Sequence, residues 1–272
     1  MFNRNDEPQI MGILNVTPDS FSDGGLHANI DAALLQAEKM LAEGANIIDV
    51  GGESTRPGSE PVSEQEQINR VLPVIQALHQ TDPTLCISID TTRQAVAEAA
   101  CKAGASMIND VSAGIADPNM LDMVANNAWP IILMHMQGTP QTMQENPFYN
   151  DVVSEVISAL QQRIYAALKA GVKPENIAID PGIGFGKRKQ DNLELLAHLK
   201  RFVDLGYPVL LGTSRKRFMG GILNVAEPSE LVTATAVTTA LGVMAGVQMF
   251  RVHDVKANRQ AADVAWAIKQ SL

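Results

Sequence analysis

Eight short apolar segments alternate with segments of helical periodicity along the chain, and this alternation limits the possible fold more than any other feature. The apolar segments read as strands at residues 10–16, 46–50, 85–90, 106–110, 130–135, 177–180, 208–213 and 248–252. They lack polar alternation, as expected of parallel strands that are buried on both faces. Helical segments cover residues 30–43, 63–79, 93–103, 117–126, 149–170, 192–202, 229–246 and 257–269. Eight βα units in 272 residues predict an α/β fold, a (β/α)8 TIM barrel in which residues 1–272 form one domain.

Local signals agree with these helix boundaries. Ser63 with Glu66 has the pattern of a capping box at the start of the second helix. Gly44, Gly104 and Gly171 stand where the C-terminal caps of three helices are expected.

Polar residues gather at or just past the C-terminal ends of the predicted strands. They are Asn15, Asp49, Asp90, Asn109 with Asp110, His135, Asp180, Thr213 with Ser214, and Arg251 with His253. This end of a TIM barrel carries the active site. A single strand that ends in Asp is ordinary turn chemistry, but nearly every strand here ends in a polar residue. The pattern therefore predicts a functional site at this face.

Three of these residues would project into an apolar barrel mouth, where an unpaired polar group costs roughly 1 to 3 kcal/mol. Asp90, Asn109 and Asp180 therefore need partners. The parallel N–H donors of an amino-pyrimidine edge would suit a carboxylate, which accepts two such bonds from arginine. The alternative is a structural network among these residues and Lys216.

Cationic residues follow the last two strands. Lys216 lies within the run Thr213-Ser214-Arg215-Lys216-Arg217, which indicates either an anionic ligand or a solvated surface cluster. Arg251 and His253 alternate along an extended chain, so both side chains fall on one side and can bind phosphate oxygens. Such barrels often hold phosphate near their last two strands.

Three glycine-containing loops adjoin this face. The loop 180–189 places Asp180 before a proline and three alternating glycines, which favours close approach to a flat ligand, although a plain turn remains an alternative. The loops 15–25 and 51–59 can cover the mouth from two sides. The side-chain oxygen of Asn15 can hold Mg²⁺ together with a substrate phosphate.

Composition narrows the functional classes. The net charge of −9 argues against nucleic acid and anionic membranes as partners. The N-terminal residues lack a signal-peptide pattern, and the two cysteines suit a reducing cytosol, so we expect a cytoplasmic protein. Residues 231–250 carry no charge, which raises a membrane span as an alternative to a buried helix running into a strand.

The chain closely resembles the dihydropteroate synthase family along almost all of its length. The resemblance rests on the segments ILNVTPDSFSDGG, DVGGESTRPGS, SIDTTR, INDVSAG, LMHMQGTP, DPGIGFGK, GTSRKR and RVHDV, which occur in the family's order. It implies a homodimeric transferase that joins 6-hydroxymethyl-7,8-dihydropterin diphosphate and 4-aminobenzoate to give 7,8-dihydropteroate and diphosphate, with Mg²⁺ as cofactor.

The resemblance also assigns residues, and it names Asp90, Lys216, Asp23, Arg251 and His253 as catalytic. The implied pterin pocket comprises Asp90, Asn109, Asp180 and Lys216, with Met134 and Phe185 as its walls. The implied diphosphate site comprises Arg251, His253, Thr55 and the magnesium ligand Asn15. The implied aminobenzoate side comprises Phe21, Thr55, Arg56, Pro57, Phe185, Lys216 and Arg217. The chain departs from the usual family pattern at Arg217, where serine is common, and in the following helix, which reads ELVTATAV.

Three rival functions remain. A methyltetrahydrofolate-dependent methyltransferase would share the pterin carboxylates but has no use for the Arg251 and His253 pair. A silent pterin-binding regulatory protein could lose Asn15 or His253, and both are present. A Schiff-base aldolase would use Lys216, but the flanking Arg215 and Arg217 are a poor setting for it unless they lower its pKa.

Overall fold

The computed structural model describes residues 7–17, 25–54 and 58–272, and of residues 25–29 the backbone only. Eight parallel strands form one sheet in the order β6-β5-β4-β3-β2-β1-β8-β7. The strands are β1 (Gln9–Asn15), β2 (Ile47–Gly51), β3 (Cys86–Asp90), β4 (Met107–Asp110), β5 (Ile131–Met134), β6 (Ile177–Asp180), β7 (Leu210–Leu211) and β8 (Met249–Val252). A bridge between Ile179 and Val209 joins β6 to β7 and closes the sheet. The predicted (β/α)8 barrel is confirmed.

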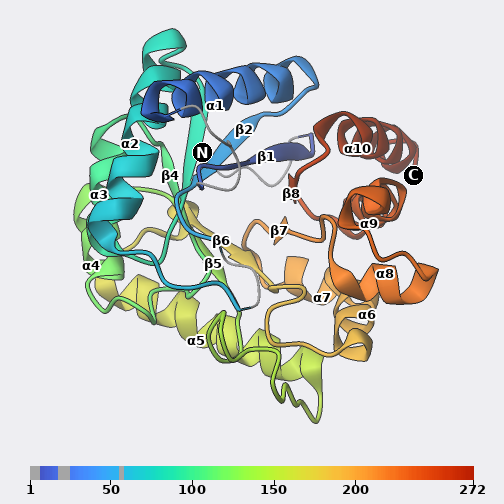
Figure 1. Cartoon of the computed structure of the whole chain (residues 1–272). Coiled ribbons are helices and arrows are strands. Elements are labelled where there is room, and N and C mark those ends of the chain that lie inside the picture. The colour runs from blue at the N-terminus through green and yellow to red at the C-terminus, as the bar shows by residue number, and fades with distance from the viewer. Residues whose placement is uncertain (1–6, 18–24, 55–57) are drawn as a thin grey trace.

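Helices surround the strands (Figure 1). The α-helices are α1 (Gly25–Ala42), α2 (Glu64–Thr81), α3 (Gln94–Lys102), α4 (Met120–Asn127), α5 (Val152–Ala170), α6 (Lys189–Ala197), α7 (Leu199–Val203), α8 (Arg217–Leu223), α9 (Val232–Ala245) and α10 (Val255–Lys269). Two short 3₁₀ helices, η2 (Pro174–Asn176) and η3 (Pro228–Leu231), precede β6 and α9.

Two predicted helices differ from the structure, and one helix was not predicted. The single helix expected at 192–202 is two helices, because His198 adopts a non-helical backbone (φ −116°, ψ 23°) and its Nδ1 lies 2.8 Å from the Glu194 carbonyl oxygen. The helix expected from Tyr149 begins at Val152, where the Asp151 side chain caps it. Helix α8 was absent from the expected helices, because its two glycines weaken the periodic signal.

The predicted caps are largely present. The backbone N–H of Glu66 donates to Ser63 Oγ at 3.2 Å, but the Glu66 carboxylate pairs with Arg70, so the capping box is one-sided. All three C-terminal glycines adopt the left-handed backbone: Gly44 (φ +99°), Gly104 (φ +124°) and Gly171 (φ +100°).

Two apolar clusters form the core. The larger one fills the space between the strands and the helices. The smaller one lies inside the barrel and consists of Met11, Ile47, Met107, Ile132, Ala178, Leu210 and Met249. Because side chains alternate across a strand, the residues two positions further along face the same interior, one layer closer to the C-terminal ends. The apolar cluster is therefore the floor of the site.

Helix α9 lies within the uncharged segment at residues 231–250. Its inner face is buried through Thr235, Thr239 and Val243, while Val237 and Leu241 on its other side are 54% and 60% exposed. Among the helices that the structure describes, none is both long and apolar enough to cross a membrane.

Candidate active site

A layer of polar side chains lies directly above the apolar floor. It is reached by stepping two residues along five strands: from Ile47 to Asp49, from Cys86 to Ser88, from Met107 to Asn109, from Ala178 to Asp180 and from Met249 to Arg251. All but Arg251 are buried, and Arg251 keeps a side-chain exposure of 19%. A buried layer of this kind at the C-terminal side of a barrel is a site for a polar ligand.

Arg251 is the central cation of this layer. Its Nε donates to Asp49 Oδ2 at 2.6 Å and its Nη2 donates to Asp90 Oδ2 at 2.7 Å. Burial opposes the charge on Arg251, but Asp49 and Asp90 outweigh it and raise the pKa of Arg251. Burial also raises the pKa of Asp90 to about 7, against the opposing effect of Arg251. Among the described residues, Oδ1 of both Asp49 and Asp90 lacks a hydrogen-bond partner.

Two glycines leave the interior open above this network. A Cβ at Gly51 would lie 3.7 Å from Asn15 Oδ1 and 3.8 Å from Asp90 Oδ2. A Cβ at Gly212 would lie 3.9 Å from Asp180 Oδ2. Asn15, Asp90 and Asp180 therefore border a space that side chains at these two positions would narrow.

The loop after β6 is folded back on Asp180. The backbone N–H of Gly182 donates to Asp180 Oδ1 at 2.7 Å. Gly182 has φ +67° and packs so closely against the His135 carbonyl that a Cβ would lie 1.8 Å from its oxygen, so only glycine fits. Burial is the main reason that the pKa of Asp180 is raised, while Lys216 and Lys187 act against it.

Lys216 and Phe185 meet at the side of this loop. The Lys216 ammonium donates to the Ile183 carbonyl oxygen and lies 4.4 Å from the centroid of the Phe185 ring. Burial lowers the pKa of Lys216 to about 8. Met134, at the end of β5, is buried and packs near Gly182. The structure thus brings together the residues predicted for the pterin pocket.

Beyond β8, His253 lies against Ser214. Ser214 Oγ is 2.9 Å from His253 Nδ1 and accepts the His253 backbone N–H at 3.1 Å. The sequence placed Ser214 and His253 at the ends of two strands but did not indicate that they pair. Arg215 forms two hydrogen bonds with Asp254, of 2.9 and 2.6 Å, and has a left-handed backbone (φ +56°). A left-handed backbone in a long side chain marks local strain, which is common at functional sites.

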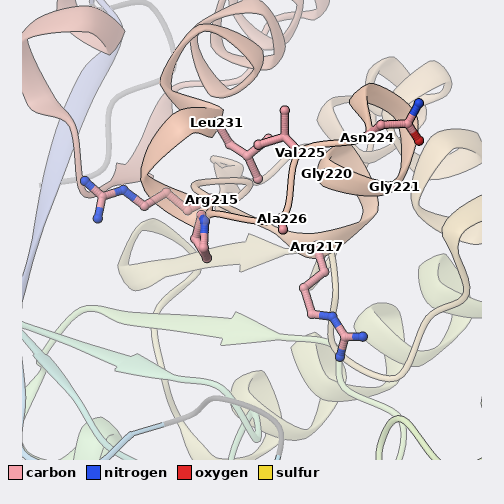
Figure 2. Close-up of a pocket in the computed structure, with 9 residues that line it drawn as sticks. Arg215, Arg217, Gly220, Gly221, Asn224, Val225, Ala226 and Leu231 are labelled. Atoms are coloured by element: carbon pink, nitrogen blue, oxygen red, sulfur yellow. The ribbon is translucent and has the colours of Figure 1, made fainter.

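Arg217 is the first residue of α8 and is exposed. Arg217 and Arg215 both line a surface hollow of about 540 Å³, which is formed by residues of α8, of η3 and of the segment between them (Figure 2). The structure therefore places two cations beside this hollow. Within the described part of the chain, no ion pair involves Arg217, so its charge is available to a ligand.

Comparison with known proteins decides the family. The model of the pterin-binding enzyme family matches residues 11–253. The chain belongs to the family of pterin-binding enzymes.

Within this pterin-binding family, the similar proteins are dihydropteroate synthases. That of Haemophilus influenzae is 47% identical over 250 residues, which cover 92% of this chain and 90% of the relative. The solved Yersinia pestis enzyme, with a sulfonamide drug, has 43% identity and a TM-score of 0.92, covering 99% of this chain and 96% of that chain. The Xanthomonas albilineans enzyme in complex with 7,8-dihydropteroate has 42% identity and a TM-score of 0.87, covering 100% and 96%. These matches confirm the resemblance seen in the sequence.

The predicted residues Phe21, Asp23, Thr55, Arg56 and Pro57 lie outside the described part of this pterin-binding chain. Their expected roles at the aminobenzoate and diphosphate sides stay predictions.

Lys187 is a residue that the sequence analysis did not single out. It is buried, and its ammonium lies 2.8 Å from the Gly182 carbonyl oxygen, 3.0 Å from the Phe185 carbonyl oxygen and 3.0 Å from His135 Nδ1. Burial lowers the pKa of Lys187 to about 7. Its position in the GFGK segment was the only sequence signal, because a lysine next to two other cations reads as exposed.

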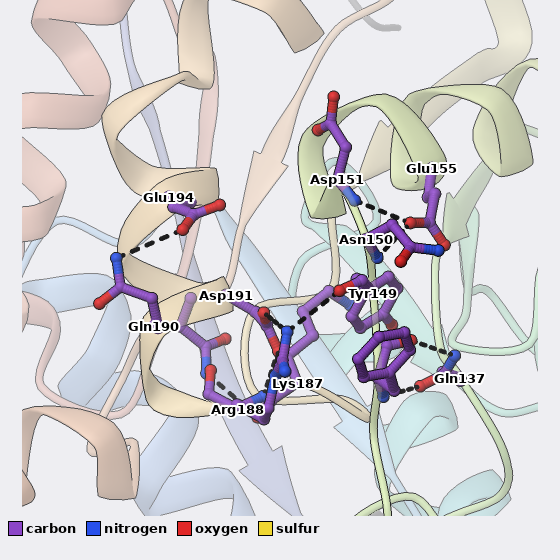
Figure 3. A network of polar contacts seen from close by, with 12 residues as sticks. Gln137, Tyr149, Asn150, Asp151, Glu155, Lys187, Arg188, Gln190, Asp191 and Glu194 are labelled. Atoms are coloured by element: carbon purple, nitrogen blue, oxygen red, sulfur yellow. Dashed lines mark hydrogen bonds and ion pairs between the residues drawn. The ribbon is translucent and has the colours of Figure 1, made fainter.

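A second network fixes the loops that follow β5 and β6 (Figure 3). Arg188 forms a two-pronged pair with Asp191, at 2.8 and 2.7 Å, and reaches the Tyr149 carbonyl oxygen at 3.3 Å. The Tyr149 hydroxyl donates to the Gly186 carbonyl oxygen at 2.9 Å. Together these bonds hold the loop that carries Phe185 against the barrel.

The His135 and Lys187 pair gives the first prediction. Burial and Lys187 lower the pKa of His135 to about 3, because protonation would place two cations 3.0 Å apart. A lowered histidine pKa contributes stability that is present above about pH 6.5 and is lost as pH falls toward 3. His135→Gln keeps an acceptor for Lys187 but cannot titrate. We expect the parent to lose stability faster than the variant between pH 6.5 and 4, by about 1 kcal/mol per pH unit after discounting for partial exposure.

Denaturant unfolding at several pH values measures this difference. The raised pKa values of Asp90 and Asp180 act in the opposite direction, but they are common to both proteins and cancel in the comparison. Parallel pH profiles for the parent and His135→Gln would contradict the assignment.

Proposed function

We propose that this chain is a transferase that condenses 6-hydroxymethyl-7,8-dihydropterin diphosphate with 4-aminobenzoate, releasing 7,8-dihydropteroate and diphosphate. The observation that carries the proposal is the end-to-end match with dihydropteroate synthases, one of them solved in complex with 7,8-dihydropteroate. The barrel-mouth geometry supports it, since the site offers buried carboxylates for a pyrimidine edge, with Arg251 in the same layer and His253 just beyond β8.

The pterin side is assigned to Asp180, Asn109 and Asp90. Asp180 and Asp90 offer carboxylate oxygens, and Asn109 adds an amide between them in the same layer. Lys216 and Phe185 cover the pterin from the loop side. Desolvation strengthens each hydrogen bond to a ligand here, because water no longer competes.

The reaction needs a leaving group to be stabilised and a nucleophile to be positioned. Arg251 and His253 are placed to take the charge that gathers on the departing diphosphate. The dihydropterin ring can delocalise positive charge at its exocyclic methylene, which favours a dissociative displacement. The arylamine then attacks the carbon held beside it, and its alignment supplies much of the rate advantage. This route requires no nucleophile from the protein.

A magnesium ion is part of the proposal. The described residues contain no cluster of three or more His, Cys, Asp or Glu side chains with metal-binding geometry. Mg²⁺ is commonly held by one or two protein oxygens together with substrate phosphates and water. Asn15, whose Oδ1 lies at the open end of β1 beside the Gly51 backbone, would hold it. The bound ion would neutralise charge on the diphosphate oxygens.

An assay of diphosphate release tests the proposed function. The pterin diphosphate is supplied with and without 4-aminobenzoate and Mg²⁺, and release is expected only when all three are present. A methyltransferase, the alternative pterin-binding enzyme, would release no diphosphate under any of these conditions. Absence of release in the complete mixture would refute the proposal.

His253→Ala tests the diphosphate side. We expect it to weaken binding of the diphosphate substrate by roughly 1.5 to 3 kcal/mol, the range for hydrogen bonds to charged groups. Binding of a diphosphate-free pterin should stay almost unchanged. Ser214→Ala is the matched control, since it removes the partner of His253 Nδ1 but keeps the imidazole, and its effect should be smaller. Calorimetry with both ligands gives the answer, and equal losses for the two would remove His253 from the diphosphate site.

Arg217→Ser tests the aminobenzoate side. If the guanidinium pairs with the aminobenzoate carboxylate, the variant should have a severalfold higher KM for 4-aminobenzoate. This increase corresponds to the roughly 1 kcal/mol that a partly exposed ion pair contributes. The KM for the pterin substrate should stay unchanged, and added salt should weaken aminobenzoate binding in the parent more than in the variant. An unchanged or lower KM would identify Arg217 as a solvated surface residue.

The proposal also includes a homodimer. Helices α9 and α10 share an apolar groove of about 600 Å³, lined by Leu241, Met244, Val264 and Ile268, all of which are at least 40% exposed. An apolar patch of this kind rarely stays open to water, and α9 offers no charged residue on its 14 positions. A second copy of the chain is the occupant that we propose. A strict monomer in sedimentation at tens of micromolar, by rough comparison with common interface affinities, would exclude it.

The cellular setting remains part of the proposal. Both Cys86 and Cys101 are free thiols, which suits the reducing cytoplasm. A net charge of −9 supports small molecules, and not nucleic acid, as the partners.

A further inference from the structure

Asp49 is fully buried beneath the barrel mouth, and one of its carboxylate oxygens accepts hydrogen bonds from two residues of the site. Arg251 Nε donates to Asp49 Oδ2 at 2.6 Å, and Asn109 Nδ2 donates to the same oxygen at 3.2 Å. We propose that Asp49 is the positioning residue of the pterin site: without touching the substrate, it sets which end of the Asn109 amide faces the ligand and fixes the plane of the Arg251 guanidinium. This inference rests on the function proposed above.

The Asn109 amide has one acceptor end and one donor end, and only one of them can face a ligand well. With Nδ2 on the Asp49 carboxylate, the acceptor Oδ1 is the end left for the ligand. The opposite orientation would set Asn109 Oδ1 against Asp49 Oδ2, two acceptors in contact in a buried layer, which costs a lost hydrogen bond and adds repulsion. Asp49 therefore makes Asn109 select ligands that present an N–H group at that point.

The same carboxylate acts on Arg251. Asp49 accepts a hydrogen bond from Nε and Asp90 accepts one from Nη2. Two carboxylates on the neighbouring strands β2 and β3 therefore hold the guanidinium from two sides. The N–H groups that remain on the planar fork are thereby given a fixed direction. Without Asp49, Arg251 would be bonded to Asp90 alone and could rotate about that contact. The remaining pair, Arg251 with Asp90, would carry no net charge.

The first test measures affinity for a diphosphate-free pterin by calorimetry, which needs no turnover. Asp49→Leu should weaken binding about tenfold, the effect of one lost orienting hydrogen bond, whereas Asp49→Asn should stay within about threefold, because its amide oxygen can still accept both bonds. Thr239→Val is the control for loss of a buried polar group: Thr239 lies in α9 outside the polar layer, is 1% exposed, and its hydroxyl donates to Asn258 Oδ1 at 2.7 Å. Its affinity should equal that of the parent.

The second test is a double-mutant cycle with Asn109→Ala. If Asp49 acts through the Asn109 amide, Asp49→Leu should cost less than about threefold in the Asn109→Ala background, against about tenfold in the parent. A purely structural role predicts equal losses in both backgrounds, and that result would overturn the proposal. So would a parent-like affinity for Asp49→Leu.

A swapped pair covers the case in which Asp49→Leu does not fold. Asn109→Asp alone sets two carboxylates against each other and should weaken pterin binding more than about tenfold, while addition of Asp49→Asn restores a donor between them and should recover most of the loss. No recovery in the swapped pair would refute the orientation. A parent that binds pterin and forms product, with variants that behave like it, would reject this inference alone and leave the proposed function standing.

Discussion

Asp180→Asn is expected to weaken pterin binding by roughly 2 to 5 kcal/mol while the fold stays intact. Asp180 Oδ1 already accepts the backbone N–H of Gly182 at 2.7 Å. In the variant, the amide oxygen must take that position, because an NH₂ group there would face another donor. The NH₂ group of the new side chain then faces the pocket, where it meets the N–H donors of the pterin edge.

Calorimetry with a pterin that lacks diphosphate measures this loss directly. Because the variant keeps the acceptor for Gly182, the loop after β6 should persist, and thermal unfolding should change little. Asp191→Asn, which touches the same loop through Arg188 and not the pocket, is the control for a general disturbance of that loop. An affinity equal to that of the parent would remove Asp180 from the pterin pocket.

Arg251→Leu is expected to lower the free energy of unfolding by about 3 to 5 kcal/mol at neutral pH. The substitution leaves the buried carboxylates of Asp49 and Asp90 facing each other across the position of the lost guanidinium. Burial already raises the pKa of Asp90, and loss of the opposing effect of Arg251 would raise it further. A raised carboxyl pKa means that stability is lost as pH increases through it, and the defect should therefore be smaller at pH 5 than at pH 8.

Denaturant titration at the two pH values measures the defect. Arg201→Leu, at an exposed position in α7, should change stability by no more than about 0.5 kcal/mol. The double variant Arg251→Leu with Asp49→Leu should recover part of the loss, because one unpaired carboxylate is removed. A defect that is small, or equal at pH 5 and pH 8, would show that the Arg251 pairs do not carry the charge balance of the layer.

The barrel could be predicted from the sequence because each strand is a short apolar run without alternation, a pattern typical of parallel strands covered by helices. The ends of individual strands and helices were predicted less accurately than the fold. Strand β7 shortens to Leu210–Leu211, and His198 breaks a helix whose periodicity reads as continuous. Strand pairing depends on contacts between elements that lie far apart in sequence, which a local pattern does not report.

The candidate site was predicted in outline but not in its connections. Asp90, Asn109, Asp180 and Arg251 were expected at the barrel mouth, and the structure places them in or next to one polar layer. The sequence also left open a structural network among Asp90, Asn109, Asp180 and Lys216. The hydrogen bonds of the layer instead run through Asp49, which joins Asn109 to Arg251. Asp49 was seen as a strand-end residue only, because the register that sets it between Asn109 and Arg251 is a property of the closed sheet.

The burial of Lys187 was also not predictable from its neighbours in the sequence. Its cationic neighbours made the run look solvated, yet backbone carbonyl oxygens from the loops after β5 and β6 surround its ammonium. The left-handed backbone of Gly182, Gly184 and Gly186 lets the second of these loops curl around the lysine. Glycine spacing indicated that the loop mattered, but not which side chain it enclosed.

Transfer of a labelled arylamine is the measurement that tests the proposed reaction most directly. Purified chain is incubated with the pterin diphosphate, Mg²⁺ and ring-labelled 4-aminobenzoate, and labelled 7,8-dihydropteroate and free diphosphate are both quantified. We predict one molecule of labelled product for each diphosphate released, with both reduced in Asp180→Asn. Diphosphate release without labelled product would identify a hydrolase, and that result would contradict the proposed transfer.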